Sequence, residues 1–466
     1  MSGYDAIVVG AGATGLTAAW RLTQAGQNVI VVEARDRVGG RLRTERHGDS
    51  DFEIGGQWLS PDQTALSALV GELGLATYAR YRDGDMVYVN AQGEVLRFSG
   101  DAIPASDSTN AAIDALTATL DDLAAKMDPD QPWEHPDAAA LDKVTFAQWL
   151  EQQTDDAEAR DNVALYIGPA MLTKPAYSFS ALQAVQMAAS AGSFSHLLDA
   201  DFILDRRVVG GLASVPRELA ARLGDRIRLN ADVTGINRFA DHAVVHVNGD
   251  ALESQNVILA LPPTHVARIR INPELPADHR HARQHQSFGL VIKVQPEYAT
   301  PFWRDAGLSG TGFAPYELVH EVYDNTPEDA TTGTLVGFVS DVNADTLGRL
   351  GDDERRATIL ASIAKYFGPQ AEQPITYVES DWQHQELTGG AYATSFAMGY
   401  LTRYGRFLRE TVGPLWFGSS DVAGLGYQHV DGAVRVGTEL AEQILKSPAG
   451  TNNDPSGRHP HQGASA

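Results

Sequence analysis

The sequence of 466 residues contains no cysteine. Disulfide bonds, zinc sites with thiolate ligands and catalysis by a thiol are therefore excluded. The sequence also has no run of apolar residues that approaches the roughly 20 needed to cross a membrane as a helix. Its first residues pass directly into a strand pattern, without the basic segment typical of a secretory signal. We therefore expect a cytoplasmic protein that does not cross a membrane.

Patterns that bind catalytic metals are also missing. There is no His-Glu-x-x-His pattern, which would place two imidazoles and a carboxylate on one helix. His281 and His285 are four residues apart in a predicted helix and could form a metal pair. Because His279, Arg280 and Arg283 surround them, we interpret this segment as a solvated helix face and expect no metal site.

Basic residues are few relative to acidic residues. The chain has 36 Lys and Arg residues against 60 Asp and Glu residues, a formal net charge of −24 and a pI of about 4.9. This balance argues against binding to nucleic acids or anionic membranes, and it favours attraction of small cationic molecules. An acidic surface that only keeps the protein in solution is the alternative. The length is sufficient for a large core and two domains.

A glycine-rich loop organises the N-terminal part of the chain. Residues 6–9 form a short apolar run typical of a buried parallel strand, and residues 16–25 have the pattern of a helix. Between them lie Gly10, Gly12 and Gly15, with the spacing Gly-x-Gly-x-x-Gly. The first glycine permits a tight turn, the second allows the backbone to approach a pyrophosphate, and the third allows the helix to pack against the strand. The free N–H groups at the start of the helix then face the phosphates.

An acidic residue follows the second predicted strand. Residues 28–32 have the pattern of this strand, and Glu33 comes directly after it. A carboxylate at this position accepts hydrogen bonds from ribose hydroxyls. A strand, a glycine loop, a helix, a second strand and an acid in this order predict a dinucleotide-binding site.

The residues that follow identify the dinucleotide. Residues 33–41 read Glu-Ala-Arg-Asp-Arg-Val-Gly-Gly-Arg, which resembles the second flavin fingerprint of the flavin amine oxidase family. The resemblance implies that the cofactor is FAD, with Arg41 near the pyrophosphate. It also implies that the segment of Gly56, Gln57 and Trp58 passes the isoalloxazine ring.

The resemblance to flavin amine oxidases extends over nearly the whole chain. It includes the Phe-Trp-Arg segment at residues 302–304, Trp382 ahead of the Thr-Gly-Gly-Ala-Tyr segment at residues 388–392, and the Asp-Gly-Ala-Val segment at residues 431–434. It implies an α/β fold of the amine oxidase and glutathione reductase type, in which a discontinuous Rossmann-type FAD-binding domain carries an inserted α+β substrate domain. The predicted FAD-binding domain comprises residues 1–79, 207–286 and 386–447, the substrate domain comprises residues 80–206 and 287–385, and residues 448–466 form a disordered tail.

Local patterns along the rest of the chain agree with this organisation. Residues from about 105 to 198 are predominantly helical, and Thr145 with Gln148 has the spacing of a capping box. A further helix is predicted from Gly210. Asn248 and Gly249 predict a hairpin turn. Other segments are predicted as follows: short strands at residues 226–229, 233–236, 243–247 and 256–261, a strand-rich region at residues 288–342, and a helix at residues 430–445 whose N-terminus can stabilise a reduced flavin.

The fingerprints and the resemblance together predict the positions that contact FAD. These positions are Gly10, Gly12, Gly15, Glu33, Arg35, Gly40, Arg41, Gly56, Gln57, Trp58, Val233, Trp382, Ala391, Asp421 and Val430. Several members of the family attach FAD covalently through a cysteine, and the matching position here is Ala391. We therefore expect FAD to be held non-covalently, by contacts to its phosphates and ribose and by burial.

The resemblance also implies an aromatic cage over the flavin. Tyr392 matches one wall of this cage, and two electron-rich rings can orient the lone pair of an amine toward the flavin N5. The second wall is normally a tyrosine. Counting without gaps from the segment at residues 431–434 places His429 there, whereas Tyr427 lies two residues earlier and is the alternative. The alternative for Tyr392 itself is ordinary core packing.

Lys293 is a lone cation in the apolar segment of residues 290–295. The resemblance places it near the flavin N5, where it takes part, through a water, in the proton transfers that accompany reoxidation by oxygen. The alternative is a lysine on the outward face of a strand. We expect Lys293, Tyr392 and His429 to be the catalytic residues.

Glu321 is the clearest indication of the substrate. The resemblance aligns residues 320–326 with the segment that lines the far end of the amine cavity, where monoamine oxidases have an aromatic or apolar residue. A carboxylate in an apolar cavity costs several kcal/mol unless it is paired, and a second ammonium group on the substrate would pair it. The spacing between Glu321 and Ala391 is similar to that of bacterial putrescine oxidases. A solvated glutamate on an edge strand is the alternative.

These observations predict an FAD-dependent amine oxidase that acts on a short diamine. The expected substrate is putrescine, bound through Glu321, Tyr392 and His429, with O2 as the acceptor and with 4-aminobutanal, ammonia and hydrogen peroxide as products. One alternative is a monoamine or cyclic-amine oxidase of the same fold. Another is a flavin-dependent desaturase or mutase, or a flavoprotein without oxidase activity. We also consider a homodimer, because dimers are common among such enzymes.

Overall fold

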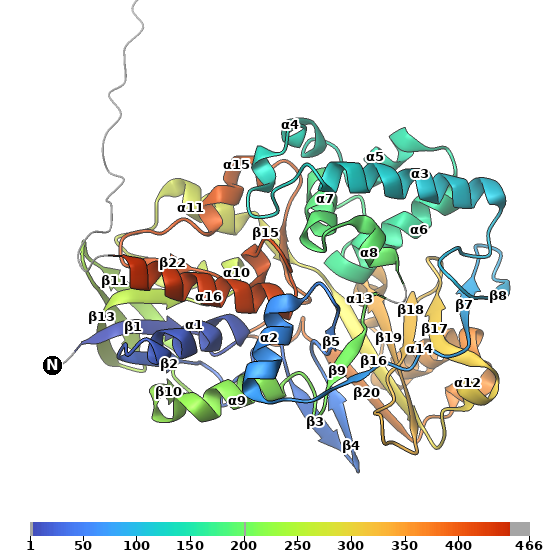
Figure 1. Ribbon diagram of the computed structural model, residues 1–466, viewed down its shortest axis with the longest axis horizontal. Coiled ribbons are helices and arrows are strands. Elements are labelled where there is room, and N and C mark those ends of the chain that lie inside the picture. Colours follow the sequence, from blue (N-terminus) through green and yellow to red (C-terminus); the bar gives the residue numbers. More distant parts are fainter. Residues whose placement is uncertain (1–2, 200–201, 448–466) are drawn as a thin grey trace, which may run out of the picture.

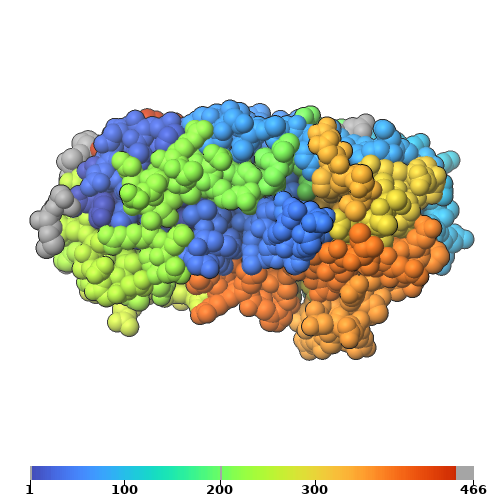
Figure 2. Space-filling model, turned by 90° about the horizontal axis from the view of Figure 1, so that it is seen from below, coloured from blue at the N-terminus to red at the C-terminus, as the bar shows by residue number. Residues whose placement is uncertain are grey.

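The structure is a computed structural model and describes residues 3–199 and 202–447 of the chain. Two large sheets lie toward opposite ends of the molecule, and a group of helices lies beside the second sheet (Figure 1). The space-filling view shows an elongated molecule in which segments from distant parts of the sequence lie side by side (Figure 2). The tail predicted to be disordered, at residues 448–466, lies outside the described residues.

The first sheet contains the predicted dinucleotide-binding unit. Its strands are β1 (Tyr4–Val9), β2 (Val29–Val32), β10 (Ile227–Arg228), β11 (Val233–Arg238), β12 (Ala243–Val247), β13 (Asp250–Leu259), β14 (Arg270–Asn272) and β22 (Leu415–Phe417). They lie in the order β10-β2-β1-β13-β12-β11-β14, and β22 also pairs with β13. β1 is parallel to β2 and to β13, as the predicted strand–helix–strand unit requires. β12 runs antiparallel to β11 and β13.

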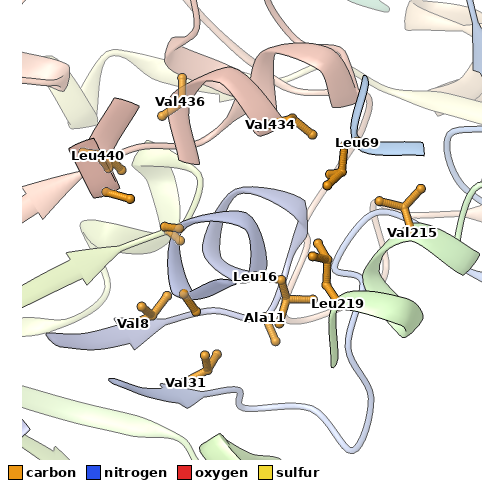
Figure 3. Close-up of a cluster of buried hydrophobic side chains, with 14 of the residues drawn as sticks. Val8, Ala11, Leu16, Val31, Leu69, Val215, Leu219, Val434, Val436 and Leu440 are labelled. Atoms are coloured by element: carbon orange, nitrogen blue, oxygen red, sulfur yellow. The ribbon is translucent and has the colours of Figure 1, made fainter. Parts of the chain in front are cut away.

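Helices pack on one face of this sheet and form its largest core. They are α1 (Ala13–Gln24), α2 (Thr64–Leu73), α9 (Ser214–Leu223) and α16 (Val430–Lys446). Figure 3 shows Val8 and Val31 beneath Leu16 of α1, with Leu219 of α9 and Leu440 of α16 nearby. The alternate residues of β1 and β2 belong to a second core on the opposite face. Both faces of these parallel strands are therefore buried, which explains their uninterrupted apolar sequence.

The second sheet lies in the region predicted to bind substrate. Its strands are β7 (Asp85–Val89), β8 (Val95–Phe98), β16 (Val291–Tyr298), β17 (Leu308–Phe313), β18 (Glu321–Asp324), β19 (Gly333–Ser340) and β20 (Thr376–Asp381), in the order β20-β16-β19-β18-β17-β7-β8. The helices α12 (Phe302–Asp305), α13 (Asp341–Leu347) and α14 (Asp352–Phe367) belong to the same region. Every residue of β16, β18 and β19 is buried. Neither Lys293 on β16 nor Glu321 on β18 is therefore a solvated strand residue.

The region from α3 to α8 is mostly helical, as the sequence predicts. It contains α3 (Asp107–Ala124), α4 (Ala138–Leu141), α5 (Phe146–Gln153), α6 (Ala157–Ile167), the π-helix η2 (Gly168–Leu172), α7 (Ala181–Ser190) and α8 (Phe194–Leu198). The predicted capping box is confirmed, because Thr145 Oγ1 accepts from the Gln148 N–H and Gln148 Oε1 accepts from the Thr145 N–H, both at 3.1 Å.

Short elements connect these parts. The small strands are β3 (Thr44–His47) with β4 (Ser50–Glu53), β5 (Trp58–Leu59) and β6 (Thr77–Ala79) on either side of β9 (Arg206–Val208), and β15 (Gln286–Phe288) with β21 (Thr394–Phe396). The short helices are α10 (Pro263–Val266), α11 (Ala277–Gln284), α15 (Leu401–Tyr404), η1 (Pro132–Glu134), η3 (Gly224–Arg226), η4 (Pro369–Glu372), η5 (Gly405–Leu408) and η6 (Ser420–Val422). The strands of the two large sheets fall within the ranges predicted for the two domains, and the domain boundaries themselves stay a prediction.

Some local predictions differ from the structure. The helix predicted from Gly210 begins at Ser214, because Gly210 and Gly211 have φ values of +79° and +85°, outside the helical region. The strand predicted at residues 256–261 is the longer β13, which begins at Asp250. The hairpin turn before it is confirmed, since Asn248 and Gly249 both have positive φ values.

The predicted solvated face around the histidine pair is only partly correct. His281 is exposed, but His279 and Arg283 are buried. The Arg283 guanidinium lies 4.2 Å from the centre of the Phe417 ring and donates to the His279 carbonyl oxygen at 2.8 Å. The helix therefore turns one charged side chain inward, where an aromatic face and backbone carbonyls replace water. Among the described residues no group of three or more potential metal ligands is present.

Candidate active site

A large cavity is lined by residues of both sheets. Its volume is about 820 Å³, near the upper end of the range for ligand pockets. It brings together most of the predicted site residues: Gly10, Gly12, Glu33, Arg35, Gly40, Arg41, Gly56, Gln57, Trp58, Val233, Lys293, Glu321, Trp382, Ala391, Tyr392, His429 and Val430. The predicted residues Gly15 and Asp421 lie outside this lining.

The glycine loop has the geometry that a pyrophosphate requires. Gly10 has a φ of +102°, and a Cβ there would lie 2.8 Å from the Ala260 carbonyl oxygen. A Cβ on Gly15 would lie 2.0 Å from the Gly10 carbonyl oxygen, so this glycine allows α1 to pack closely and has no need to face the cavity. A Cβ on Gly12 would meet no atom within 4 Å, which leaves room for a ligand to approach the backbone. Because no side chain caps α1, its first N–H groups are available to an anion.

Glu33 supports this loop and lines the cavity. Its Oε2 accepts from the Ala11 N–H at 2.8 Å and its Oε1 from the Arg35 N–H at 3.0 Å. The side chain is buried and lines the cavity. Each carboxylate oxygen has a further lone pair, and in the dinucleotide-binding pattern an acid at this position accepts from ribose hydroxyls.

Arg41 is held on the cavity wall by the C-terminal part of the chain. Its guanidinium forms an ion pair with Asp421 at 2.5 Å and donates to the Tyr392 carbonyl oxygen at 2.6 Å. Asp421 also accepts from the Thr394 N–H at 2.7 Å. Burial opposes ionisation of Asp421, but Arg41 and these hydrogen bonds outweigh it and lower the pKa of Asp421 below its usual value. Asp421 therefore supports Arg41 from behind, and we do not place it in contact with the cofactor.

The N-terminus of α16 also reaches the cavity. Val430 and Ala433, in its first turn, line the wall. His429 is the N-cap residue, and its side chain does not cap the helix. The first N–H groups and the positive end of the helix dipole are therefore available to negative charge on a ligand.

Tyr392 and His429 lie on the wall of the same cavity. Burial and the nearby Glu321 raise the pKa of Tyr392 well above its usual value, so its hydroxyl stays neutral. His429 Nδ1 is 2.9 Å from the Tyr427 carbonyl oxygen, which fixes the position of the imidazole. Tyr427, the alternative second wall, is buried outside the lining, and its hydroxyl donates to the Thr394 carbonyl oxygen at 3.1 Å. Of the two, His429 is therefore the residue that can contact a ligand.

Lys293 lies inside the protein on the cavity wall. Its Nζ donates to the backbone oxygens of Glu53 and Gly55 at 2.7 and 2.9 Å, and to the side-chain oxygen of Gln57. Burial lowers the pKa of Lys293 to about 7. An amine that can gain or lose a proton near neutral pH is suited to proton transfer.

Glu321 places a carboxylate on the wall between aromatic rings. It is 6% exposed, and its Oε2 accepts from the Tyr323 hydroxyl at 2.8 Å. No Lys, Arg or His among the described residues forms an ion pair with it. Burial raises the pKa of Glu321 to about 7. The cavity thus contains a buried acid without a cationic partner, which a ligand cation could provide.

Aromatic residues that the sequence analysis did not single out complete this part of the wall. They are Tyr166, Tyr323 and Phe338. Trp58 packs edge-on against Tyr323, with ring centres 5.7 Å apart. The sequence does contain a signal for Tyr323. Residues two apart on a strand share a face, so the prediction that Glu321 faces the cavity also places Tyr323 there. Tyr166 and Phe338 come from other elements, and no local pattern connects them to the site.

The sequence model of one protein family, the flavin-containing amine oxidoreductases, matches residues 13–445. The chain belongs to this family. It is 50% identical to putrescine oxidase of Kocuria rosea over 453 residues, which cover 95% of each chain. A structure of putrescine oxidase bound to putrescine has 54% identity and a TM-score of 0.95, covering 96% of this chain and all of the other. Cyclohexylamine oxidase of Brevibacterium oxydans has 30% identity and a TM-score of 0.91, covering 96% of this chain and 99% of the other.

Membership of the flavin-containing amine oxidoreductases confirms several predictions. The α/β flavin amine oxidase fold, the class of enzyme and the FAD cofactor are as expected. No helix among the described residues is long and apolar enough to cross a membrane. The cytoplasmic location and the homodimer stay predictions, as do the roles of individual site residues.

Proposed function

We propose that this flavin amine oxidase acts on a short diamine, with putrescine as the best candidate. The observation that carries the proposal is the Glu321 carboxylate, which is buried on the cavity wall and has no cationic partner among the described residues. An ammonium group at one end of a diamine would provide that partner. The similarity to putrescine oxidases supports the same substrate class.

Glu321 binds the distal ammonium group of the diamine in this proposal. Burial raises the pKa of Glu321 to about 7, and a bound cation favours the ionised carboxylate and lowers that pKa again. The Tyr323 hydroxyl donates to Glu321 at 2.8 Å and fixes the orientation of the carboxylate. The aromatic rings around it exclude water, which strengthens the charge–charge attraction.

Tyr392 and His429 orient the reacting end of the substrate. They line the cavity together and would flank the second amine, which reacts as the neutral base. The raised pKa of Tyr392 keeps its hydroxyl uncharged, so it does not attract a protonated amine to this position. Oxidation should accordingly become faster as pH rises and more of the reacting amine is neutral.

The residues present fit FAD, and Ala391 indicates that it binds non-covalently. The glycine loop, Glu33, Arg41 and the start of α16 would hold its phosphates, ribose and ring system. When bound, FAD accepts two electrons and a proton equivalent from the substrate carbon and passes the electrons to O2. Lys293, with its pKa near 7, holds or supplies a proton on the cavity wall during reoxidation.

The overall reaction is balanced with one water. Putrescine, O2 and H2O give 4-aminobutanal, ammonia and hydrogen peroxide. The C–N bond of the substrate is oxidised to an imine, which water hydrolyses, while O2 is reduced by two electrons. The acceptor role of O2 and the role of Lys293 belong to this proposal.

Anaerobic reduction of the holoenzyme tests the substrate class. The flavin absorbance is followed after mixing with 1,4-diaminobutane or with 1-aminobutane. Fast bleaching by the diamine alone supports the proposal, and Glu321→Gln should abolish this preference. Glu297→Gln is the matched control. Glu297 is also buried, but it lies outside the cavity lining and accepts hydrogen bonds from the hydroxyls of Ser50 and Thr332. Equal bleaching by both amines in the wild type would refute the diamine assignment and leave a general amine oxidase.

A further inference from the structure

A closed ring of hydrogen bonds surrounds the amine of Lys293. Lys293 Nζ donates to Gln57 Oε1, and Gln57 Nε2 donates to Asn325 Oδ1 at 2.7 Å. Asn325 Nδ2 donates to Gln295 Oε1 at 3.0 Å, and Gln295 Nε2 donates to the Glu53 backbone oxygen at 3.1 Å. Lys293 donates to that same Glu53 oxygen at 2.7 Å, which closes the ring. All five residues are buried.

The direction of the hydrogen bonds in this ring is fixed by the Glu53 carbonyl. Each side-chain amide has an oxygen that accepts and a nitrogen that donates, so turning one amide over forces its neighbours to turn as well. Turning all three would place Gln295 Oε1 against the Glu53 oxygen, which can only accept. The chain of amides must therefore present the oxygen of Gln57, and not its nitrogen, to Lys293.

The partners of Lys293 favour its protonated form. A protonated amine has three N–H donors, whereas a neutral amine has two donors and a lone pair. The three partners are the oxygens of Glu53, Gly55 and Gln57. A neutral amine would leave one of these oxygens without a donor and turn its lone pair toward an oxygen. The ring thus opposes burial, which lowers the pKa of Lys293 to about 7.

Charged neighbours have opposing effects on Lys293. Glu53 on β4 raises the pKa of Lys293 and Arg207 on β9 lowers it. These two residues form an ion pair with each other at 2.7 Å, and both are buried. The strands that pair with β16 place Phe338 and Ser380 opposite Lys293, and neither is charged. The Trp58 ring also faces the amine, with its centre 5.8 Å from Lys293 Nζ. The three hydrogen-bond acceptors add to the effects of Glu53 and of this ring in favouring the protonated amine.

We propose that Gln57, Asn325 and Gln295 are positioning residues that keep Lys293 protonated and fixed in place on the wall of the cavity. Gln57 lines the cavity, whereas Asn325 and Gln295 lie outside its lining and act through the ring. This proposal rests on the proposed function in one respect, which is that Lys293 takes part in flavin reoxidation. The effect of the ring on the lysine itself is independent of which amine is oxidised.

The titration of Lys293 can be observed directly, because the chain contains only six lysines. The holoenzyme is labelled with ¹³C at lysine Cε, and the lysine signals are followed by NMR against pH. Lys293→Met identifies the Lys293 signal by its loss. Asn325→Leu removes the partner that orients Gln57, and it should lower the titration midpoint of Lys293 by about one pH unit, since a hydrogen bond to a charged group is worth roughly a tenfold change in an equilibrium.

Asn325→Asp should move the same midpoint in the opposite direction. The aspartate still accepts from Gln57 Nε2 and adds a negative charge close to the lysine, so it favours the protonated amine. It cannot donate to Gln295 Oε1, so its effect comes from the charge and from the orientation of Gln57. Gln295→Met breaks the ring from its other side and replaces Asn325→Leu if that variant does not fold. It should lower the midpoint as Asn325→Leu does.

Asn162→Leu is the matched control. Asn162 is also buried, and its amide donates to the Tyr88 hydroxyl and to the Glu158 carbonyl oxygen at 2.9 Å, outside the ring. This variant should lower the thermal midpoint without moving the Lys293 titration. If Asn325→Leu and Gln295→Met behave in the same way as Asn162→Leu, the ring has only a structural role and the inference is wrong. Failure of every diamine to reduce the flavin would refute the proposed function without altering these titrations.

Discussion

Replacing Glu321 by glutamine would remove the charge that we assign to the distal ammonium group. The glutamine has nearly the same size, and its oxygen can still accept from the Tyr323 hydroxyl. Two unit charges about 4 Å apart attract by about 4 kcal/mol at an effective dielectric constant of about 20. Loss of one member of a buried ion pair costs about 2–5 kcal/mol. We therefore expect kcat/KM for putrescine to fall by roughly 30- to 4000-fold, with little change for 1-aminobutane.

The stability of the same variant should depend on pH in a defined direction. Burial raises the pKa of Glu321 from 4.5 to about 7 in the folded protein. The folded state therefore binds more protons than the unfolded state between these values, and wild-type stability falls as pH rises through this range. The full penalty, about 3 kcal/mol, is present above pH 7 and absent below about pH 4.5. Glu321→Gln should be more stable than the wild type at pH 8 and equally stable at pH 4.

Two measurements on one variant make the assignment testable. Stopped-flow reduction with each amine measures the loss of the diamine preference, and denaturant unfolding at the two pH values measures the stability gain. A solvated Glu321 would give neither effect. A variant that is more stable at pH 8 but retains its preference for putrescine would show that Glu321 is buried and yet does not bind the substrate, which would refute the reasoning.

Other parts of the site lead to separate predictions. Gly12→Ala should leave the protein folded, because the added Cβ has free space, but it should weaken FAD binding, measured by flavin release. Gly15→Ala should lower the thermal midpoint of unfolding, because the added Cβ would lie 2.0 Å from a backbone oxygen. Asp421→Asn removes the charge that holds Arg41, and it should raise the dissociation constant for FAD by about tenfold or more in a titration of the apoprotein. Ala391→Cys should retain flavin on the protein in a denaturing gel, whereas the wild type should release it. Lys293→Met should slow reoxidation of the reduced enzyme by O2 by roughly 100-fold, with a smaller effect on anaerobic reduction.

The sequence predicted the parts of the site that depend on local geometry. The positions of Gly10, Gly12 and Gly15 follow from the sharp turn between β1 and α1. The neighbouring backbone requires a glycine at residues 10 and 15, whereas Gly12 leaves room for a ligand to approach. The resemblance to flavin amine oxidases then brought distant segments together correctly, since Lys293 and Tyr392 line one cavity.

The supporting residues could not be predicted in the same way. Asp421 acts on Arg41 from the far end of the chain, and the sequence does not show that it lies behind the arginine instead of beside the cofactor. Gln295 lies on β16 and Asn325 directly follows β18, and β19 lies between these two strands in the sheet. Only the tertiary arrangement therefore brings their amides together. Interactions of this kind depend on tertiary contacts of particular atoms, which leave no periodic signal in a sequence.

The charged groups around the cavity differ in whether the protein itself satisfies them. Arg41 has Asp421, Arg207 has Glu53, and Lys293 has three oxygen acceptors. Glu321 has one hydrogen bond from a neutral hydroxyl and no cation, and its raised pKa shows what that arrangement costs. Leaving a buried acid unpaired lowers stability above neutral pH, so an apolar residue there would give a more stable protein. Such a cost is expected where a ligand supplies the missing charge, and a diamine supplies it at a fixed distance from the amine that reacts.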